Sequence, residues 1–209
     1  MSIGILGNKI GMTQIFDKKG EIIPVTIVKG GPCIITQIKS ENNSGYNAIQ
    51  IGYGEIGANL KKLTKPELGH FNKVNLPPFR YLKEYKINEP SEFQIGQQFN
   101  VEMFQIGEVV NVTGMTIGKG NTGNIKGHGF HRGPMGHGGK SKRLQGSLGS
   151  GTTPGRVFPG KRMPRRKGNE KVTIKGLQII EIDKTQNLLV IKGSIPGKPG
   201  NLVSIKSGK

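Results

Sequence analysis

The sequence predicts a mostly β protein: a closed antiparallel β-barrel with a long irregular basic extension and a small α/β insertion. Two observations predict the barrel. Short β-branched segments recur on both sides of a central region, and closing such strands into a barrel removes exposed sheet edges. A third observation predicts the extension, because residues 118–168 are rich in Gly, Lys and Arg and poor in large apolar side chains.

The first half of the barrel is expected to hold three β-branched strands, over 21–30, 32–40 and 46–54. In the third strand Ile49, Ile51 and Tyr53 alternate with small or polar residues, which is typical of a half-buried strand. The predicted domains are the barrel over 1–54, 101–117 and 169–209, the insertion over 55–100 and the extension over 118–168.

The insertion is expected to contain a short helix over 65–74, because Pro66 suits the first turn of a helix. No role for the insertion follows from its chemistry. We expect its His70 to be structural or exposed rather than a ligand.

The remaining strands flank the extension. One is expected over 108–118, and three follow over 171–183, 187–194 and 201–207, separated by the turn sequences "DKTQN" and "IPGKPG". Gly176 shifts the apolar phase of its strand and indicates a β-bulge.

The extension concentrates positive charge. The chain has a net charge of +18 and a pI near 10.1, and the extension holds twelve of its 31 Lys and Arg residues and none of its 13 acidic residues. Ordering this segment costs on the order of 50–100 kcal/mol, more than its scattered apolar side chains offset by burial. We therefore expect an external polyanion to order it.

Folded RNA is the predicted polyanion, because the extension contains no recognition helix or zinc finger for duplex DNA. Its many glycines allow backbone N–H groups to approach phosphates closely. The candidate RNA-binding residues are the cations and histidines of the extension: Lys119, Lys126, His128, His131, Arg132, His137, Lys140, Lys142, Arg143, Arg156, Lys161, Arg162, Arg165, Arg166 and Lys167.

Two glycine motifs raise the alternative of a nucleotide-binding enzyme. Residues 133–141 end in Gly-Lys-Ser, but a P-loop requires glycine at position 134, where this chain has Pro134. Gly118, Gly120 and Gly123 match a dinucleotide-binding pattern, but we expect no helix after them, and the required acidic residue is missing. We expect no cofactor and no small-molecule substrate.

The histidines His128, His131 and His137 raise the alternative of a metal site. Zinc sites rest on an ordered scaffold with supporting carboxylates, and the extension has no carboxylate, so we expect no metal. For the same reason we expect no catalytic residues. The single cysteine, Cys33, is expected to be a small buried residue. No apolar stretch approaches the roughly 18 residues of a membrane span, so we expect no membrane partner.

Several joined motifs resemble the L-three family of large-ribosomal-subunit proteins. They are "GILGNKIGMTQIF" (4–16), "RGPMGHGGKSKR" (132–143), "GSLGSGTTPGRVFPGKRM" (146–163) and "GNEKVT" (168–173). The segments "KPELGH", "LKEY" and "GTTPGRVFPGKRM" are similar to the cyanobacterial and plastid branch. The resemblance covers nearly the whole chain.

The resemblance implies a six-stranded translation-protein barrel and an extension that runs through large-subunit rRNA. It also implies early binding during subunit assembly, neighbouring large-subunit ribosomal proteins as partners, and a ribosome in a plastid stroma or a bacterial or cyanobacterial cytoplasm. The tip of the extension, which approaches the peptidyl transferase centre in this family, corresponds to Gly149, Ser150, Gly151, Thr152, Thr153 and Pro154.

The sequence departs from the family at two places. The tip has no Gln, so the Gln methylation of some bacterial members is not implied, and "KRMPRRKG" (161–168) is more basic than usual. An RNA chaperone or a translation factor that visits the ribosome is the alternative function.

Overall fold

The computed structural model describes residues 3–57 and 63–208. It divides the chain into two compact units. One contains the chain up to Met115 and again from Lys171, and the other is Thr116–Glu170. The second unit includes the whole extension. Residues 1–2, 58–62 and 209 of the predicted barrel and insertion lie outside the described residues.

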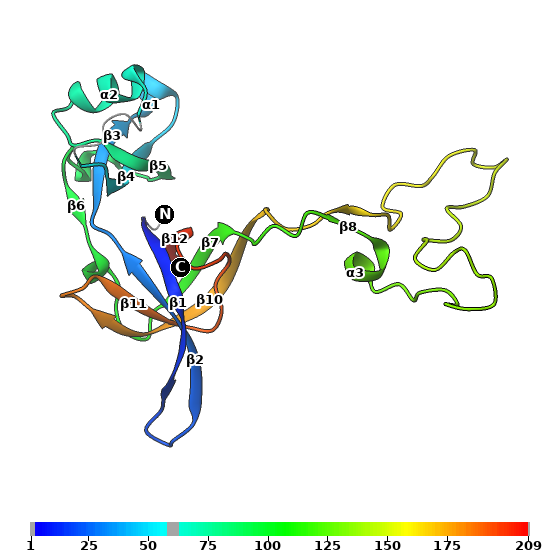
Figure 1. Cartoon of the computed structure of the whole chain (residues 1–209). Coiled ribbons are helices and arrows are strands. Elements are labelled where there is room, and N and C mark those ends of the chain that lie inside the picture. The colour runs from blue at the N-terminus through cyan, green and yellow to red at the C-terminus, as the bar shows by residue number, and fades with distance from the viewer. Residues whose placement is uncertain (1–2, 58–62, 209) are drawn as a thin grey trace. The chain divides into compact units, whose positions relative to one another are not determined.

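The first unit contains a closed barrel of six antiparallel strands (Figure 1). In barrel order the strands are β1 (Gly4–Phe16), β12 (Leu202–Ser207), β7 (Val109–Met115), β10 (Lys171–Asp183), β11 (Leu188–Lys192) and β2 (Ile22–Gly30). The first and last strands pair directly, with Ile5 opposite Ile205. The predicted six-stranded closed antiparallel barrel is therefore confirmed.

The barrel interior is filled by β-branched and leucine side chains. Ile5, Val112, Ile179, Leu189 and Ile205 come from five different strands and are all fully buried. Strand β10 also contains the expected bulge, because its register against β7 shifts between Ile174 and Leu177. Gly176, at this shift, has a φ of +76°, a conformation that glycine adopts without strain.

The assignment of residues 32–40 and 46–54 to the barrel was wrong. These segments form β3 (Cys33–Lys39) and β4 (Ala48–Glu55), which join β5 (Phe79–Lys86) and β6 (Gln98–Phe99) in a separate four-stranded sheet. Its order is β5-β4-β3-β6. An alternating pattern predicts that a strand is half-buried, but the strand's partners are set by contacts distant in sequence.

The predicted helix of the insertion is confirmed as α2 (Lys65–Asn72). Pro66 lies in its first turn. The backbone N–H of Thr64 donates to Glu67 Oε2 at 2.8 Å, which is half of a capping box. The described residues of this unit also contain α1 (Glu41–Ser44) and the 3₁₀ turns Pro90–Glu92 and Val101–Met103.

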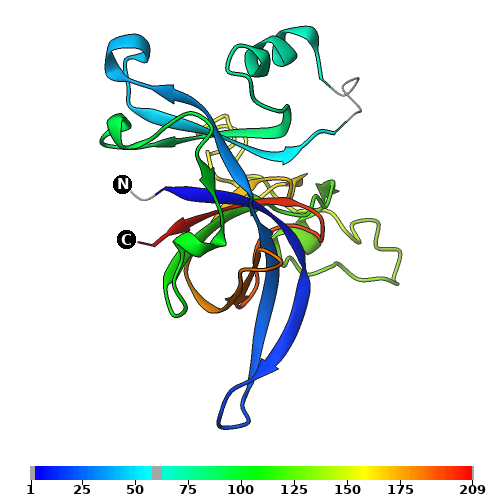
Figure 2. The ribbon, with the colours of Figure 1, turned by 90° about the vertical axis from the view of Figure 1, so that its left-hand side faces the viewer.

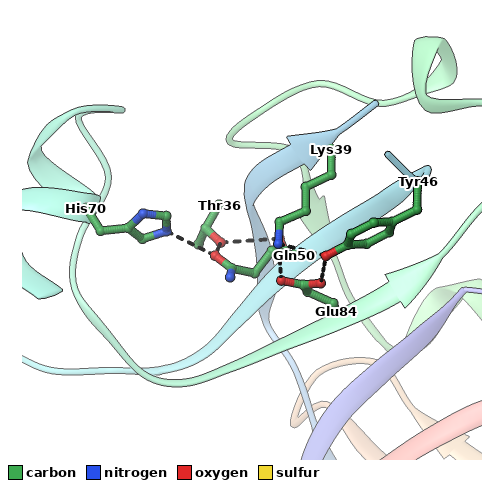
Figure 3. A network of polar contacts seen from close by, with 6 residues as sticks. All are labelled: Thr36, Lys39, Tyr46, Gln50, His70 and Glu84. Atoms are coloured by element: carbon green, nitrogen blue, oxygen red, sulfur yellow. Dashed lines mark hydrogen bonds and ion pairs between the residues drawn. The ribbon is translucent and has the colours of Figure 1, made fainter. Parts of the chain in front are cut away.

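Polar side chains brace the four-stranded sheet (Figure 3). His70 Nε2 lies 3.0 Å from Gln50 Oε1, so this histidine is structural, as expected. Lys39 Nζ lies 2.6 Å from Glu84 Oε1. This hydrogen bond raises the pKa of Lys39 and lowers that of Glu84. It is the one ion pair found within residues 3–57 and 63–208.

The barrel and the four-stranded sheet share one hydrophobic core. Cys33 lies within it, fully buried, as expected. The backbone N–H of Leu6 in β1 donates to Cys33 Sγ at 3.4 Å. Burial raises the pKa of this thiol to about 11. The shared core joins the two sheets into one unit.

Strands β1 and β2 continue beyond the barrel as a two-stranded hairpin (Figure 2). Met12, Phe16 and Ile22 are more than half exposed on it. Phe16 and Ile22 are opposite each other in the strand register, so their side chains share one face.

Candidate nucleic-acid interface

The extension begins and ends as a narrow antiparallel ladder. Thr116 N–H donates to Glu170 O at 2.9 Å, and Lys119 N–H donates to Lys167 O at 2.8 Å. The ladder continues into a two-stranded sheet of β8 (Asn121–Thr122) and β9 (Arg165–Arg166). Backbone pairing therefore fixes the root of the extension, where apolar packing is scarce.

A short helix, α3 (Asn124–His128), follows Gly123 directly (Figure 1). The expectation that no helix follows the Gly118, Gly120 and Gly123 motif was therefore wrong. The helix has no apolar stripe to mark it in the sequence, since it spans only five residues. The strand before it, β8, has two residues, so the strand–turn–helix unit of a dinucleotide-binding site is not formed.

Beyond α3 the chain is irregular but internally connected. Asn124, which is 3% exposed, donates from Nδ2 to Gln145 Oε1 at 2.9 Å and to Arg162 O at 3.4 Å. His128 Nε2 lies 3.1 Å from Met163 O. These hydrogen bonds connect the segment at residues 124–128 with two later segments, at residue 145 and at residues 162–163. The bonded residues are 21 to 38 positions apart in sequence. The sequence reasoning missed Asn124 and Gln145, because neither carries charge and no motif marks them.

These segments line an open hollow of about 1020 Å³ within the extension. Five of the fifteen predicted RNA-binding residues line it: His128, His131, Arg132, Arg143 and Arg162. The other ten lie elsewhere along the extension: Lys119, Lys126, His137, Lys140, Lys142, Arg156, Lys161, Arg165, Arg166 and Lys167. The structure thus brings one third of the predicted set together.

The cations of the extension have no acidic partners. Every Lys and Arg from 118 to 168 is exposed except Lys167, which is half-buried. None of them forms an ion pair in the described part of the chain, where the one pair joins Lys39 and Glu84. Uncompensated positive charge along a segment that presents its side chains outward is the electrostatic footprint of a polyanion interface.

The predicted tip, residues 149–154, is exposed along its whole length. Gly149 N–H donates to Ser147 Oγ at 3.3 Å and begins the turn. On its return side, Arg156 Cζ lies 5.3 Å from the ring centroid of Phe158, which is 60% exposed. A guanidinium over an exposed ring is suited to stacking on a base.

The described residues do not form the arrangements that a metal site, a P-loop or a membrane-spanning helix requires. Within residues 3–57 and 63–208, no three His, Cys, Asp or Glu side chains lie close enough to hold a metal ion. No helix begins at Lys140, so the glycine run before it has no phosphate-binding helix terminus. None of the described helices has the length and apolar character needed to cross a membrane.

A cationic group that the sequence reasoning missed lies in the first unit. Lys83 Nζ and Lys206 Nζ lie 5.4 and 4.8 Å from the ring centroid of Tyr85. Burial, followed by the positive charges of Lys171 and Lys206, lowers the pKa of Lys83 to about 8. The three lysines come from different strands, so only the folded topology shows that they are neighbours.

Together the fold and the interface define a class: a basic β-barrel protein with a long cationic extension. A family model described as "Ribosomal protein L3" matches residues 85–190. Large ribosomal subunit protein uL3c of Phaeodactylum tricornutum is 60% identical over 98% of this chain and 98% of its own length. Large ribosomal subunit protein uL3 of Synechococcus elongatus is 56% identical over 98% of this chain and 95% of its own.

A further relative, uL3c of Guillardia theta, is 53% identical over 99% of this chain and its own full length. The chain belongs to the ribosomal protein L3 family. Its similarity to both cyanobacterial uL3 and uL3c proteins confirms the predicted branch.

Proposed function

We propose that the chain is a structural constituent of the large ribosomal subunit that binds the subunit's rRNA through its extension. Its relatives are named as large ribosomal subunit proteins. The observation that carries the RNA-binding role is the charge of the extension: twelve cations, no acid between 118 and 168, and no ion pair there. The protein performs no reaction; it supports RNA that is already folded.

The proposed contacts are mainly to phosphates. Each cation that neutralises a phosphate releases condensed counterions, which favours binding at low salt. All fifteen predicted residues are proposed to contribute, and the exposed tip at 149–154 is proposed to approach the peptidyl transferase centre. Early binding during assembly and contacts with neighbouring large-subunit proteins belong to the same proposal, in a plastid or cyanobacterial ribosome.

Substitution of matched lysines tests the phosphate contacts. Lys140, Lys142 and Lys161 are exposed in the extension, and Lys18, Lys19 and Lys184 are exposed on the first unit. We expect the triple Lys→Gln change in the extension to weaken binding to large-subunit rRNA by at least about tenfold at low salt. The triple change on the first unit serves as the control for net charge. Equal effects of the two variants would contradict a localised interface.

Sedimentation separates a resident protein from a transient factor. A structural constituent stays with the large subunit after a moderate salt wash, because its extension is held among RNA helices. A chaperone or translation factor leaves in the same wash. Release of the chain under conditions that retain other large-subunit proteins would reject the structural role.

A further inference from the structure

The hollow in the extension is amphipathic. Phe130, Leu144 and Pro164 supply apolar surface to its lining, and Arg132, Arg143 and Arg162 supply positive charge. Leu144 is 70% exposed, so its side chain lacks the burial that an apolar group of this size normally finds. A volume of about 1020 Å³ accommodates a ligand of nucleotide size.

One polar side chain in the lining of the hollow has an acceptor atom without a hydrogen-bond partner. Asn124 uses its Nδ2 donors on Gln145 and Arg162, while its Oδ1 is buried without any hydrogen-bond partner. Buried polar atoms are nearly always paired in native proteins, so an orphaned acceptor in a hollow indicates a missing donor. Gln145, which is half-buried, also lines the hollow beside Asn124.

We propose that this hollow receives one unstacked nucleotide of the rRNA, with its base against Phe130 and Leu144 and its phosphates at the arginines. The inference rests on the proposed function and adds a base-contacting site to its phosphate contacts. A nucleobase combines a flat apolar face with N–H donors on its edge, and the attached phosphate supplies the negative charge. A nucleotide therefore matches all three features of the lining.

Simpler ligands leave part of the lining unmatched. Free inorganic phosphate would satisfy the arginines but leave Phe130 and Leu144 in water. An apolar ligand would bury the guanidinium groups without a counterion, which is costly. A base that remains paired and stacked in a helix cannot place its face on Phe130, so the nucleotide has to be extruded from its helix.

Zero-length ultraviolet crosslinking tests the proposal on the full chain bound to large-subunit rRNA, since it joins bases to the side chains they touch. Trypsin separates the two aromatic residues of the extension. Phe130 is released in "GHGFHR" (127–132) and Phe158 in "VFPGK" (157–161). We expect a single nucleotide attached to the Phe130 peptide, at one position in the RNA sequence.

Two matched variants complete the test. Phe130→Leu keeps an apolar side chain but removes the ring, and we expect it to reduce this crosslink at least about tenfold and to weaken RNA binding about five- to hundredfold. Phe158→Leu, outside the hollow, leaves the crosslink at residues 127–132 intact.

The outcomes separate this inference from the proposed function. Salt-dependent RNA binding without a crosslink at 127–132 overturns the nucleotide site and leaves the phosphate contacts standing. Attachment of that peptide to a ribosomal protein in intact subunits overturns it as well, and makes an acidic peptide the occupant. Absence of RNA binding by the unmodified chain overturns the proposed function itself.

Discussion

The hydroxyl of Tyr85 in β5 lies 2.7 Å from Ser204 Oγ in β12, and this buried contact joins the four-stranded sheet to the barrel. Tyr85 is fully buried and Ser204 is 4% exposed, so neither hydroxyl has water as a substitute partner. The two residues are 119 positions apart in sequence. With the contact between Leu6 and Cys33, it adds hydrogen bonds between the two sheets to a core that is mostly apolar.

Removal of the Tyr85 hydroxyl is expected to destabilise the first unit. Tyr85→Phe keeps the ring but leaves Ser204 unpaired, at a cost of about 1–3 kcal/mol in the free energy of unfolding. Urea denaturation followed by circular dichroism measures the loss. The control is Tyr46→Phe, which removes an exposed hydroxyl that bonds to Glu84. A loss at Tyr85 no larger than that at Tyr46 would show that the buried contact contributes little.

Lys83 is predicted to make stability depend on pH. Its folded pKa of about 8 lies below the ordinary 10.5, so the unfolded chain holds the proton more tightly between these values, and stability rises with pH across this window. Lys83→Met is therefore expected to raise the free energy of unfolding near neutral pH. The advantage should shrink between about pH 8 and 10.5. Lys86→Met, on an exposed position of the same strand, is the control; a gain at Lys83 that persists at high pH would contradict the charge argument.

The thiol of Cys33 is expected to be unreactive in the folded chain. It is fully buried, and burial raises its pKa to about 11, so little thiolate forms near pH 8. Alkylation by iodoacetamide followed by mass spectrometry should show slow labelling that accelerates in urea. Rapid labelling without denaturant would mean that the shared core opens readily at β3.

Gly168 is expected to be required at the root of the extension. Its φ is +73°, and a Cβ there would collide with Ile117 O and with Gly118 Cα. Gly168→Ala should distort the ladder at Lys167 and weaken rRNA binding about tenfold, since such backbone strain costs about 1–3 kcal/mol. Gly136→Ala, at a position with open space and no positive φ, should bind as the unmodified chain does. Filter binding compares the two, and equal affinities would show that the root tolerates distortion.

The sequence predicted the individual strands because the pattern that marks a strand is local. Alternating segments such as 46–54 mark strands, and Gly176 marked a bulge that the register confirms. The partners of those strands were not predicted, because β3 and β4 differ from barrel strands only in the distant segments they meet. Pairing of β4 with β5 depends on a contact such as Ile49 with Tyr85, for which the sequence has no separate signal.

The interface was predicted in composition but not in shape. Charge and the lack of acids are visible in any window of the extension, so its cations could be named from the sequence. The hollow could not, because it depends on Asn124 meeting Gln145 and Arg162. Helix α3 was missed for a similar reason, since one turn closed by Gly129 carries no hydrophobic periodicity.

A salt titration of rRNA affinity tests the central claim most directly. If the extension neutralises about 6–10 phosphates, the affinity of the full chain for large-subunit rRNA should fall by roughly 10³–10⁵ between about 50 and 200 mM salt. The triple Lys→Gln variant at Lys140, Lys142 and Lys161 should show a slope shallower by about 2–3 in the plot of log affinity against log salt. An affinity that does not change with salt would contradict the claim that the extension binds RNA through its phosphates.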